Sequence, residues 1–518
     1  MKQSLIRTKK GIRSFKISNM NQCKRILILL LLVGTFLGSC KKYIAVNTNP
    51  NNPTAVPPSV LLPTTITGIA WANGNDLSRA TSAIMQHIAG VANQTLGYDV
   101  YNFSGAFDNQ WNGELYDGVI NNCVALINLD SLSSPIYSGI AKLEMAYAFS
   151  IATDVWGEVP YSQAGQGLAN TYPRFDKVED IYQGNASLKI TSLFDLVKSG
   201  LADLAKPTNL LRPKTDDLVY GGDASKWIRM GNTLLLKFGI MLTNKNSAMA
   251  KSVIQSVIDG SNFINTNALD FDVPFGTGTN NMNPIYAFNT VNRSGDQMLS
   301  NRLLALSRSL NDTLRLSKFF TKPKGIFTGF DNGSTSVAPV AATRSQYGSS
   351  IADPANAGFG TGLYLTGTGG NAPIHLLTNF QVNFILAEAA LVLGTTGDAN
   401  ALYQAGIKAS MLKVGIAQAD IDAYFLANPT VVTLAGTTEQ KRQQIITQKY
   451  MAWMGNGIEV FDDYRRTGYP VLALPLNPGG DDPSVIPTRL PYTNGELSTN
   501  PNAPNPRPLV DVKLWWAK

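Results

Sequence analysis

Apolar residues recur at helical spacing in five separate stretches, and this pattern limits the possible folds more than any other feature of the sequence. In the first stretch, Ile140, Leu143, Tyr147 and Ile151 lie three or four residues apart, so a helix would place them on one face. The other stretches lie at 190–204, 227–241, 380–391 and 446–453. Because an apolar helix face must be buried against another element, the sequence predicts a mainly α protein in which helices pack on helices.

The pattern changes between the third and fourth stretches. Gly, Asn, Thr, Ser and Pro dominate 271–293 and 325–371, which predicts long loops with short strands. Helix pairs on both sides of such an insertion indicate an α-α superhelix with degenerate repeats, since no fixed-period repeat is found. We therefore expect one domain at 59–518, with a helical scaffold at about 59–260 and 372–470 and a large irregular insertion at about 261–371.

Three sets of residues predict where helices begin. Asp176 with Glu179 and Thr437 with Gln440 have the spacing of a capping box, in which the first side chain accepts from an early amide and the fourth reaches back. Asp398 precedes a helical stretch and is a candidate N-cap.

The first 40 residues have the pattern of an export signal. Eight basic residues and no acidic residue precede Cys40, and the aliphatic run at 26–33 is too short to span a bilayer. Leu37-Gly-Ser-Cys40 follows and resembles the lipobox of bacterial lipoproteins, whose cysteine is acylated. We predict a signal peptide at 1–39, lipidation of Cys40 and a flexible tether at 40–58. The alternative is an ordinary secretory signal with an incidental cysteine.

Removal of the predicted signal changes the charge of the chain. The sequence has 43 basic and 36 acidic residues, and the eight basic residues before Cys40 leave 35, so the mature chain has one more acidic than basic residue. No basic excess remains to favour nucleic acid or an anionic membrane surface as a partner. Cys123 is the only cysteine after Cys40, so an intramolecular disulfide would need the cysteine that acylation blocks.

Three charged or aromatic motifs first suggest structural roles. In the motif at 154–161, Gly157 and Pro160 would end a helix and turn the chain, with Trp156 and Tyr161 packing over the helix end. Glu388 is expected to pair or cap locally. The arginines at 465–466, which stand beside the acids at 462–463, are expected to form an ion-pair network.

The same motifs resemble, in order, signatures of the SusD/RagB outer-membrane nutrient-binding lipoproteins. They are DVWGEVPY at 154–161, YPRFD at 172–176, IY at 181–182, FILAEAA at 384–390, Tyr403 with GIKASM at 406–411, QKY at 448–450, DYRRTGYP at 463–470, and RLPY at 489–492 with Glu496. The resemblance implies tetratricopeptide-like helix pairs packed under an irregular ligand-binding face. It also implies a SusC-type TonB-dependent barrel as partner, over which the lipoprotein sits as a lid.

The resemblance further implies a lipid-anchored location at the outer membrane of a member of the Bacteroidetes, facing the cell surface. Surface-exported lipoproteins of that group often carry acidic residues just after the acylated cysteine, whereas Lys41 and Lys42 follow Cys40 here. The leaflet on which the chain is displayed therefore stays open at this point.

The sequence offers little for catalysis. Asp154 and Glu158 could be the carboxylate pair of a glycosidase, but Gly157 interrupts the helix between them and nothing sets their separation. His87 and His375 are the only histidines, which excludes a multi-histidine metal site, and neither lies beside a nucleophile motif. We expect a protein that is not an enzyme, without a cofactor or a metal site; calcium binding is possible and not decided by the sequence.

Two stretches have the composition of a sugar site, because aromatic faces cover the C–H surfaces of a sugar while amides and guanidinium groups bond its hydroxyls. The candidate ligand contacts of the first stretch are Tyr98, Tyr101, Asn102, Phe103 and Trp111. Those of the second are Asn283, Tyr286, Asn289 and Arg293. The structural alternative is that these side chains pin their loops to the scaffold.

The expected function is therefore the capture of an oligosaccharide or polysaccharide and its delivery to the transporter. Two alternatives keep the same fold. RagB-like members are associated with peptide uptake, and the same aromatic and amide groups could hold an extended peptide. The chain could also be a structural lid of the transporter without a high-affinity ligand of its own.

Overall fold

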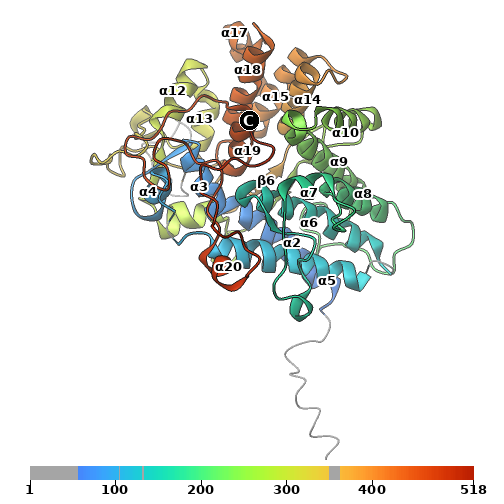
Figure 1. The fold of residues 1–518 in the computed structure, drawn as a ribbon. Helices are drawn as coiled ribbons and strands as arrows, with labels where there is room; N and C mark the ends of the chain where they lie inside the picture. The colour runs from blue at the N-terminus through green and yellow to red at the C-terminus, as the bar shows by residue number, and fades with distance from the viewer. Residues whose placement is uncertain (1–55, 104, 131–132, 349–361) are drawn as a thin grey trace, which may run out of the picture. The chain divides into compact units, whose positions relative to one another are not determined.

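The computed structural model of the protein describes residues 56–103, 105–130, 133–348 and 362–518 (Figure 1). The predicted signal peptide, the lipidation site Cys40 and the tether as far as residue 55 lie outside the described residues, as does the stretch 349–361 of the insertion. The predictions for them stay predictions. The fold below is that of the unit Pro57–Lys518.

Helices account for most of the chain before the insertion. They are α2 (Pro58–Gly74), α3 (Asp76–Ile84), α4 (Asn93–Asp99), the π-helix η2 (Gln110–Ile120), α5 (Asn121–Asp130), α6 (Pro135–Trp156), α7 (Val178–Gln183), α8 (Leu193–Leu204), α9 (Ala224–Met241) and α10 (Ser247–Gly260). The predicted apolar stretches at 140–151, 190–204 and 227–241 coincide with α6, α8 and α9. The prediction of three packed helices in this part is confirmed.

Helices also dominate the chain after the insertion. They are α14 (Asn379–Val392), α15 (Ala399–Lys413), α16 (Gln418–Ala427), α17 (Pro429–Val432), α18 (Thr438–Ala452), α19 (Gly457–Thr467) and α20 (Asn494–Thr499). The stretches at 380–391 and 446–453 belong to α14 and α18. Together with the first part, these helices confirm a mainly α, superhelical fold.

The segment 261–371, expected to be irregular, contains regular elements as well as loops. It holds the short turns α11 (Pro284–Tyr286) and η6 (Ala287–Asn292) and the helices α12 (Asn301–Ser309) and α13 (Thr313–Phe319). Short strands tie it to the scaffold: β4 (Phe271–Val273) pairs with β6 (Ile374–Leu377), and β5 (Gln297–Leu299) pairs with β1 (Ile88–Gly90), both antiparallel. A third antiparallel pair, β2 (Val159–Pro160) with β3 (Phe175–Asp176), closes the loop after α6.

The centre of the core is α6, which packs against α5, α8, α9 and η2. Its apolar residues are almost all buried. At its crossing with α8, Gly139 faces Gly200, and a Cβ on either glycine would lie 2.9 Å from the carbonyl oxygen of the other. The two backbones can approach this closely because neither residue has a side chain.

The structure bears out two of the three predicted helix starts. Thr437 and Gln440 form a complete capping box on α18, and Asp398 accepts a hydrogen bond from the amide of Ala401 at 2.7 Å. The prediction for Asp176 was wrong: α7 begins after Lys177, without a side-chain cap. The Asp176 carboxylate instead accepts from the amide of Ser162 at 2.6 Å and pairs with Arg174.

Buried charged side chains link the helices α9, α14, α18 and α19 to one another. Glu388 on α14 pairs with Arg466 on α19 through two contacts of 2.6 and 2.7 Å, and with Arg442 on α18 at 2.9 Å. Lys237 on α9 meets Glu459 on α19 at 2.6 Å. We call this set, with its neighbours Lys449, Asp462, Asp463 and Arg465, the buried charge network.

The segment after α19 runs over the scaffold to α20 and returns, so that the C-terminus ends beside α19 (Figure 1). Its contacts fix this course: the amide of Leu490 donates to the carbonyl of Val155 at 2.9 Å, and the amide of Lys518 donates to the carbonyl of Arg465 at 3.0 Å. The described helices include none with the length and apolar character needed to cross a bilayer.

Candidate functional site

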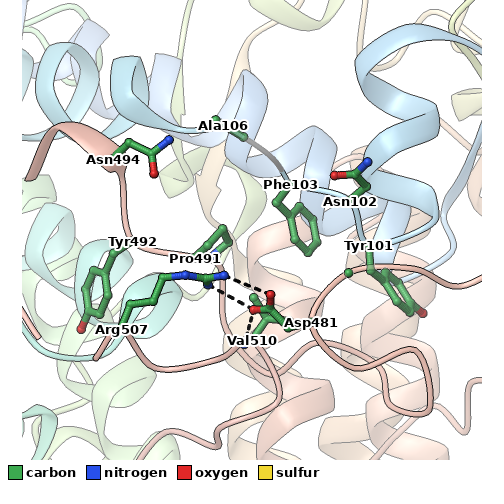
Figure 2. Close-up of a pocket in the computed structure, with 12 residues that line it drawn as sticks. Tyr101, Asn102, Phe103, Ala106, Asp481, Pro491, Tyr492, Asn494, Arg507 and Val510 are labelled. Carbon is green, nitrogen blue, oxygen red and sulfur yellow. Dashed lines mark hydrogen bonds and ion pairs between the residues drawn. The ribbon is translucent and has the colours of Figure 1, made fainter. Parts of the chain in front are cut away.

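A cavity of about 280 Å³ opens between the loop after α4 and the C-terminal segment (Figure 2). Its walls come from the loop after α4, with residues 101–103 and 105–106, and from three pieces of the C-terminal segment, at 480–481, 491–494 and 507–510. We call it the loop cavity. Tyr101, Asn102 and Phe103 lie on one side in Figure 2, and Tyr492 and Arg507 lie opposite.

The loop at 100–107 has an unusual backbone that sets the shape of one wall. Tyr101 and Phe107 have φ angles of +66° and +78°, a left-handed conformation that costs a residue with a side chain about 1–2 kcal/mol. Packing offsets this cost, because the rings of Tyr98 and Phe107 stack with centroids 5.6 Å apart. A hydrogen bond of 2.7 Å from the amide of Gly479 to the carbonyl of Val100 joins the loop to the C-terminal segment.

Gly480 completes this junction. Its φ is +79°, and a Cβ there would collide with the carbonyl oxygen of Tyr101. Only glycine allows the two segments to pass at this distance without strain. The floor of the loop cavity thus depends on a close backbone approach between residues almost 380 positions apart in the chain.

The loop cavity has no net charge on its walls. Asp481 and Arg507 line it and pair with each other at the rim through two contacts of 3.0 and 3.1 Å. Burial raises the pKa of Tyr492 to about 12 and that of Tyr101 further, so both phenols are protonated at neutral pH. The side-chain amide of Asn494 has no hydrogen-bond partner among the described residues and is exposed.

Three of the five candidate ligand contacts in the first stretch line the loop cavity, namely Tyr101, Asn102 and Phe103. Asn102 is exposed, whereas the two aromatic side chains are at most 7% exposed and contribute mainly a wall. Tyr98 and Trp111 are 1% and 2% exposed and pack inside the protein, Trp111 against Trp156 at 4.9 Å. For Tyr98 and Trp111 the structural interpretation fits better than ligand contact.

None of the four candidates in the second stretch lines the loop cavity. Asn283 is buried; it caps α11 by accepting from the amide of Ile285 at 2.8 Å and donates to the carbonyl of Ala372. Asn289 is buried and donates to the carbonyl of Tyr347 at 2.9 Å, and Tyr286 is also buried. Arg293 alone has an exposed side chain. The three buried residues serve the fold of the insertion, which composition could not reveal.

The residues weighed for catalysis have places in the scaffold. Asp154 is buried and accepts from the hydroxyl of Tyr182 at 2.9 Å and from the indole nitrogen of Trp516 at 3.0 Å. His87 is completely buried, and burial lowers its pKa to about 3. His375 contacts Asp272 at 2.8 Å and stacks on Tyr364. In the ranges that the structure describes, no group of three potential metal-ligating side chains gathers.

The part of the loop cavity that the C-terminal segment contributes was not foreseen from the sequence. Gly480, Asp481, Asn494 and Arg507 belong to a Pro/Asn/Gly-rich segment that follows the last helical signature. Such composition indicates loops, and loops often carry binding residues. That general signal did not indicate which end of the scaffold the loops would reach.

The packed helices described above make this chain an α-superhelical protein, and the loop cavity lies among the loops that its scaffold supports. The chain belongs to the SusD-like family described as starch-binding and associating with the outer membrane, whose family model matches residues 50–493. No curated protein sequence matches the chain.

Solved structures show the same fold. A chitin-binding protein is 23% identical with a TM-score of 0.72, over 89% of this chain and 100% of its own. A chitin-binding SusD homologue from Flavobacterium johnsoniae is 21% identical with a TM-score of 0.68, over 89% and 98%. A SusD homologue from Bacteroides fragilis is 21% identical with a TM-score of 0.71, over 89% and 100%. At this identity the likeness establishes the fold and leaves the ligand open.

Proposed function

We propose that this protein is a lipid-anchored, non-catalytic receptor that captures a neutral oligosaccharide or polysaccharide and delivers it to a SusC-type TonB-dependent transporter. The observation that carries the proposal is the loop cavity, which has aromatic walls and a balanced Asp481–Arg507 pair, on a member of a family described as starch-binding. Chitin-binding proteins of the same fold agree with a glycan as ligand.

The chemistry of the loop cavity suits a neutral sugar. The walls include the aromatic residues Tyr101, Phe103 and Tyr492, which suit the C–H surfaces of a sugar. The amide of Asn494 can both donate to and accept from a hydroxyl. Asp481 and Arg507 neutralise each other, so they can bond hydroxyls without favouring an ionic ligand. A charged glycan or a strongly charged peptide would meet no compensating excess charge there.

The route to the transporter rests on the sequence predictions. Acylation of Cys40 would hold the chain at the outer membrane, and the tether would let it reach a barrel in the same membrane. We place the protein on the cell surface, where polymeric nutrients arrive. A test by labelling of intact cells would contradict this placement if the chain became accessible only after lysis.

The deciding experiment is a calorimetric titration of the chain that starts after Cys40 with maltoheptaose, chitohexaose and a peptide digest, followed by analysis of each mixture for cleavage. We expect one of the two sugars to bind without products, and Asn494→Ala with Arg507→Ala to weaken it by about tenfold or more, as loss of polar contacts predicts. Arg308→Ala, an exposed arginine outside the cavity, is the matched control. Binding of peptides alone, or cleavage of a sugar, would overturn the proposal.

A further inference from the structure

A second groove of about 400 Å³ lies between η2, the loop at 160–173 and α20. No described residue lines both this groove and the loop cavity. Figure 1 shows α20 at the edge of the scaffold below α2, at the turn of the C-terminal segment. We call this depression the α20 groove.

The backbone of the loop that forms the rim is firmly held. The amide of Arg174 donates to the side-chain oxygen of Gln163 at 2.8 Å. From the other side, Asn500 donates to the carbonyl of Pro173 at 3.0 Å and Asn502 to the carbonyl of Tyr172 at 2.8 Å. The backbone at 172–174, held by these three bonds, loses little conformational entropy when a ligand binds.

The side chains of Gln163 and Asn170 bond each other in this loop, but four other side chains at the groove have no such bond among the described residues. Gln166, Thr171 and Tyr172 are exposed, and so is Asn112 on η2 across the groove. None of these four side chains has a hydrogen-bond partner within the part of the chain that the structure describes. Tyr172 is 55% exposed, so its side chain is accessible to a ligand.

The charge of the α20 groove narrows the class of ligand. Among the residues that the structure describes, Glu496 is the one acidic residue that lines it, and no Lys, Arg or His does. The Glu496 carboxylate accepts from Asn500 at 2.8 Å and lies half-buried, and desolvation raises its pKa. An anionic ligand would be repelled, whereas the paired hydroxyls of a sugar match a carboxylate flanked by amides.

We propose that the α20 groove is a second binding site for a neutral oligosaccharide, with Tyr172 against one sugar face and Gln166 and Asn112 bonding its hydroxyls. The class of ligand rests on the proposed function, but the site is separate. A peptide that binds by adding a strand to a sheet is less suited, because that mode needs a free strand edge. The strands at this groove, β2 and β3, have two residues each and pair with each other.

The test compares two variants of the groove with two references in the intact mature chain. Tyr172→Ala and Gln166→Ala/Asn112→Ala remove the proposed contacts. Leu168→Ala changes a residue of the same loop that is 97% exposed and does not line the groove. Asn494→Ala changes the loop cavity alone. Calorimetry and tryptophan fluorescence with maltoheptaose and chitohexaose give the affinity and the number of sites.

We expect the wild-type chain to bind sugar at two sites. The affinity of the α20 groove should fall by about tenfold in Tyr172→Ala, as for loss of an aromatic contact, and should be unchanged in Leu168→Ala and Asn494→Ala. A wild-type chain that binds one sugar molecule, with Tyr172→Ala indistinguishable from Leu168→Ala, would overturn the second site and leave the proposed function standing. Binding lost in Tyr172→Ala and kept in Asn494→Ala would support the α20 groove and refute the loop cavity. No binding of either sugar would overturn both.

Discussion

The buried charge network and the loop cavity use the same kinds of side chain for opposite purposes. In the network, Glu388 is 1% exposed and surrounded by Arg442 and Arg466, which hold its pKa below the usual range. At the loop cavity, Asp481 and Arg507 also form a two-contact pair, but the arginine side chain is 42% exposed. Burial therefore separates a pair that holds the fold from one that is free to meet a ligand.

The comparison also shows where family signatures act. Glu388, Asp463 and Arg466 belong to the motifs that resemble the SusD/RagB proteins, and all three lie in the buried charge network. Most residues around the loop cavity, by contrast, lie outside those motifs, and only Pro491 and Tyr492 belong to one of them. The motifs in the buried charge network therefore maintain the scaffold, whereas the loop cavity is built mainly from other residues.

The largest expected effect comes from breaking the buried pair. Arg466→Met leaves part of the Glu388 charge uncompensated in the core and should lower the free energy of unfolding by about 3–5 kcal/mol. Arg507→Met at the exposed pair should cost about 0–1 kcal/mol. Urea denaturation of both variants measures the difference. Equal losses would contradict the distinction between the two pairs.

The contribution of Asp99 to the free energy of unfolding should depend on pH in the opposite sense from that of Glu388, because Asp99 has no cationic contact among the described residues. Asp99, at the end of α4, is buried and accepts from Asn332 and Gly333 of the insertion, and burial raises its pKa to about 7. Because the folded chain keeps this proton and the unfolded chain releases it near pH 4, the contribution to stability is fully present below pH 4 and is lost as the pH rises through 7.

Asp99→Asn should remove this loss, which amounts to about 2 kcal/mol between pH 5 and pH 7. Urea denaturation at several pH values gives the slope for the wild type and the variant. Asp482→Asn serves as the control. Hydrogen bonds from Ser484 lower the pKa of that exposed carboxylate, so its removal should leave the slope between pH 5 and pH 7 unchanged. A wild-type slope that persists in Asp99→Asn would show that another group is responsible.

The junction under the loop cavity should be sensitive to a single methyl group. Gly480→Ala forces a Cβ onto the Tyr101 carbonyl at a positive φ, and we expect a loss of about 1–2 kcal/mol together with weaker sugar binding. Gly221→Ala has a similar φ of +63° with open space around the Cβ, so it should lose about 1 kcal/mol and keep full binding. Thermal unfolding measures the stability of the two variants, and calorimetry measures their affinity for the sugar. Equal affinities of Gly480→Ala and Gly221→Ala would argue against a role of the junction in binding.

Local patterns in the sequence were enough to predict the helices and some of their starts. The apolar stripes located α6, α8, α9, α14 and α18, and the capping box at Thr437 and Gln440 is present. The cluster at 462–466 was expected to form ion pairs, and Arg465 does pair with Asp462 at 2.5 Å. These features depend on neighbours three or four positions apart, so the sequence contains the information directly.

Long-range partners were beyond that reasoning. Glu388 was expected to pair locally, yet its partner Arg466 is 78 positions away. Asp176 has the spacing of a cap, but the carboxylate is taken by Ser162 and Arg174. Glu388 therefore pairs with a distant arginine, and Asp176 binds a distant amide together with a neighbouring arginine, in place of the local roles expected for them.

By itself the sequence determined the helical class, the resemblance to a family and the prediction of an export signal with a lipidated cysteine. The tertiary structure decided which aromatic and amide side chains face a cavity and which are buried, as Tyr98, Trp111, Asn283 and Asn289 show. It also brought Tyr101, Asn102 and Phe103 beside the C-terminal segment. The physical reason is that composition records which groups a loop carries, whereas exposure depends on every distant segment that packs over it.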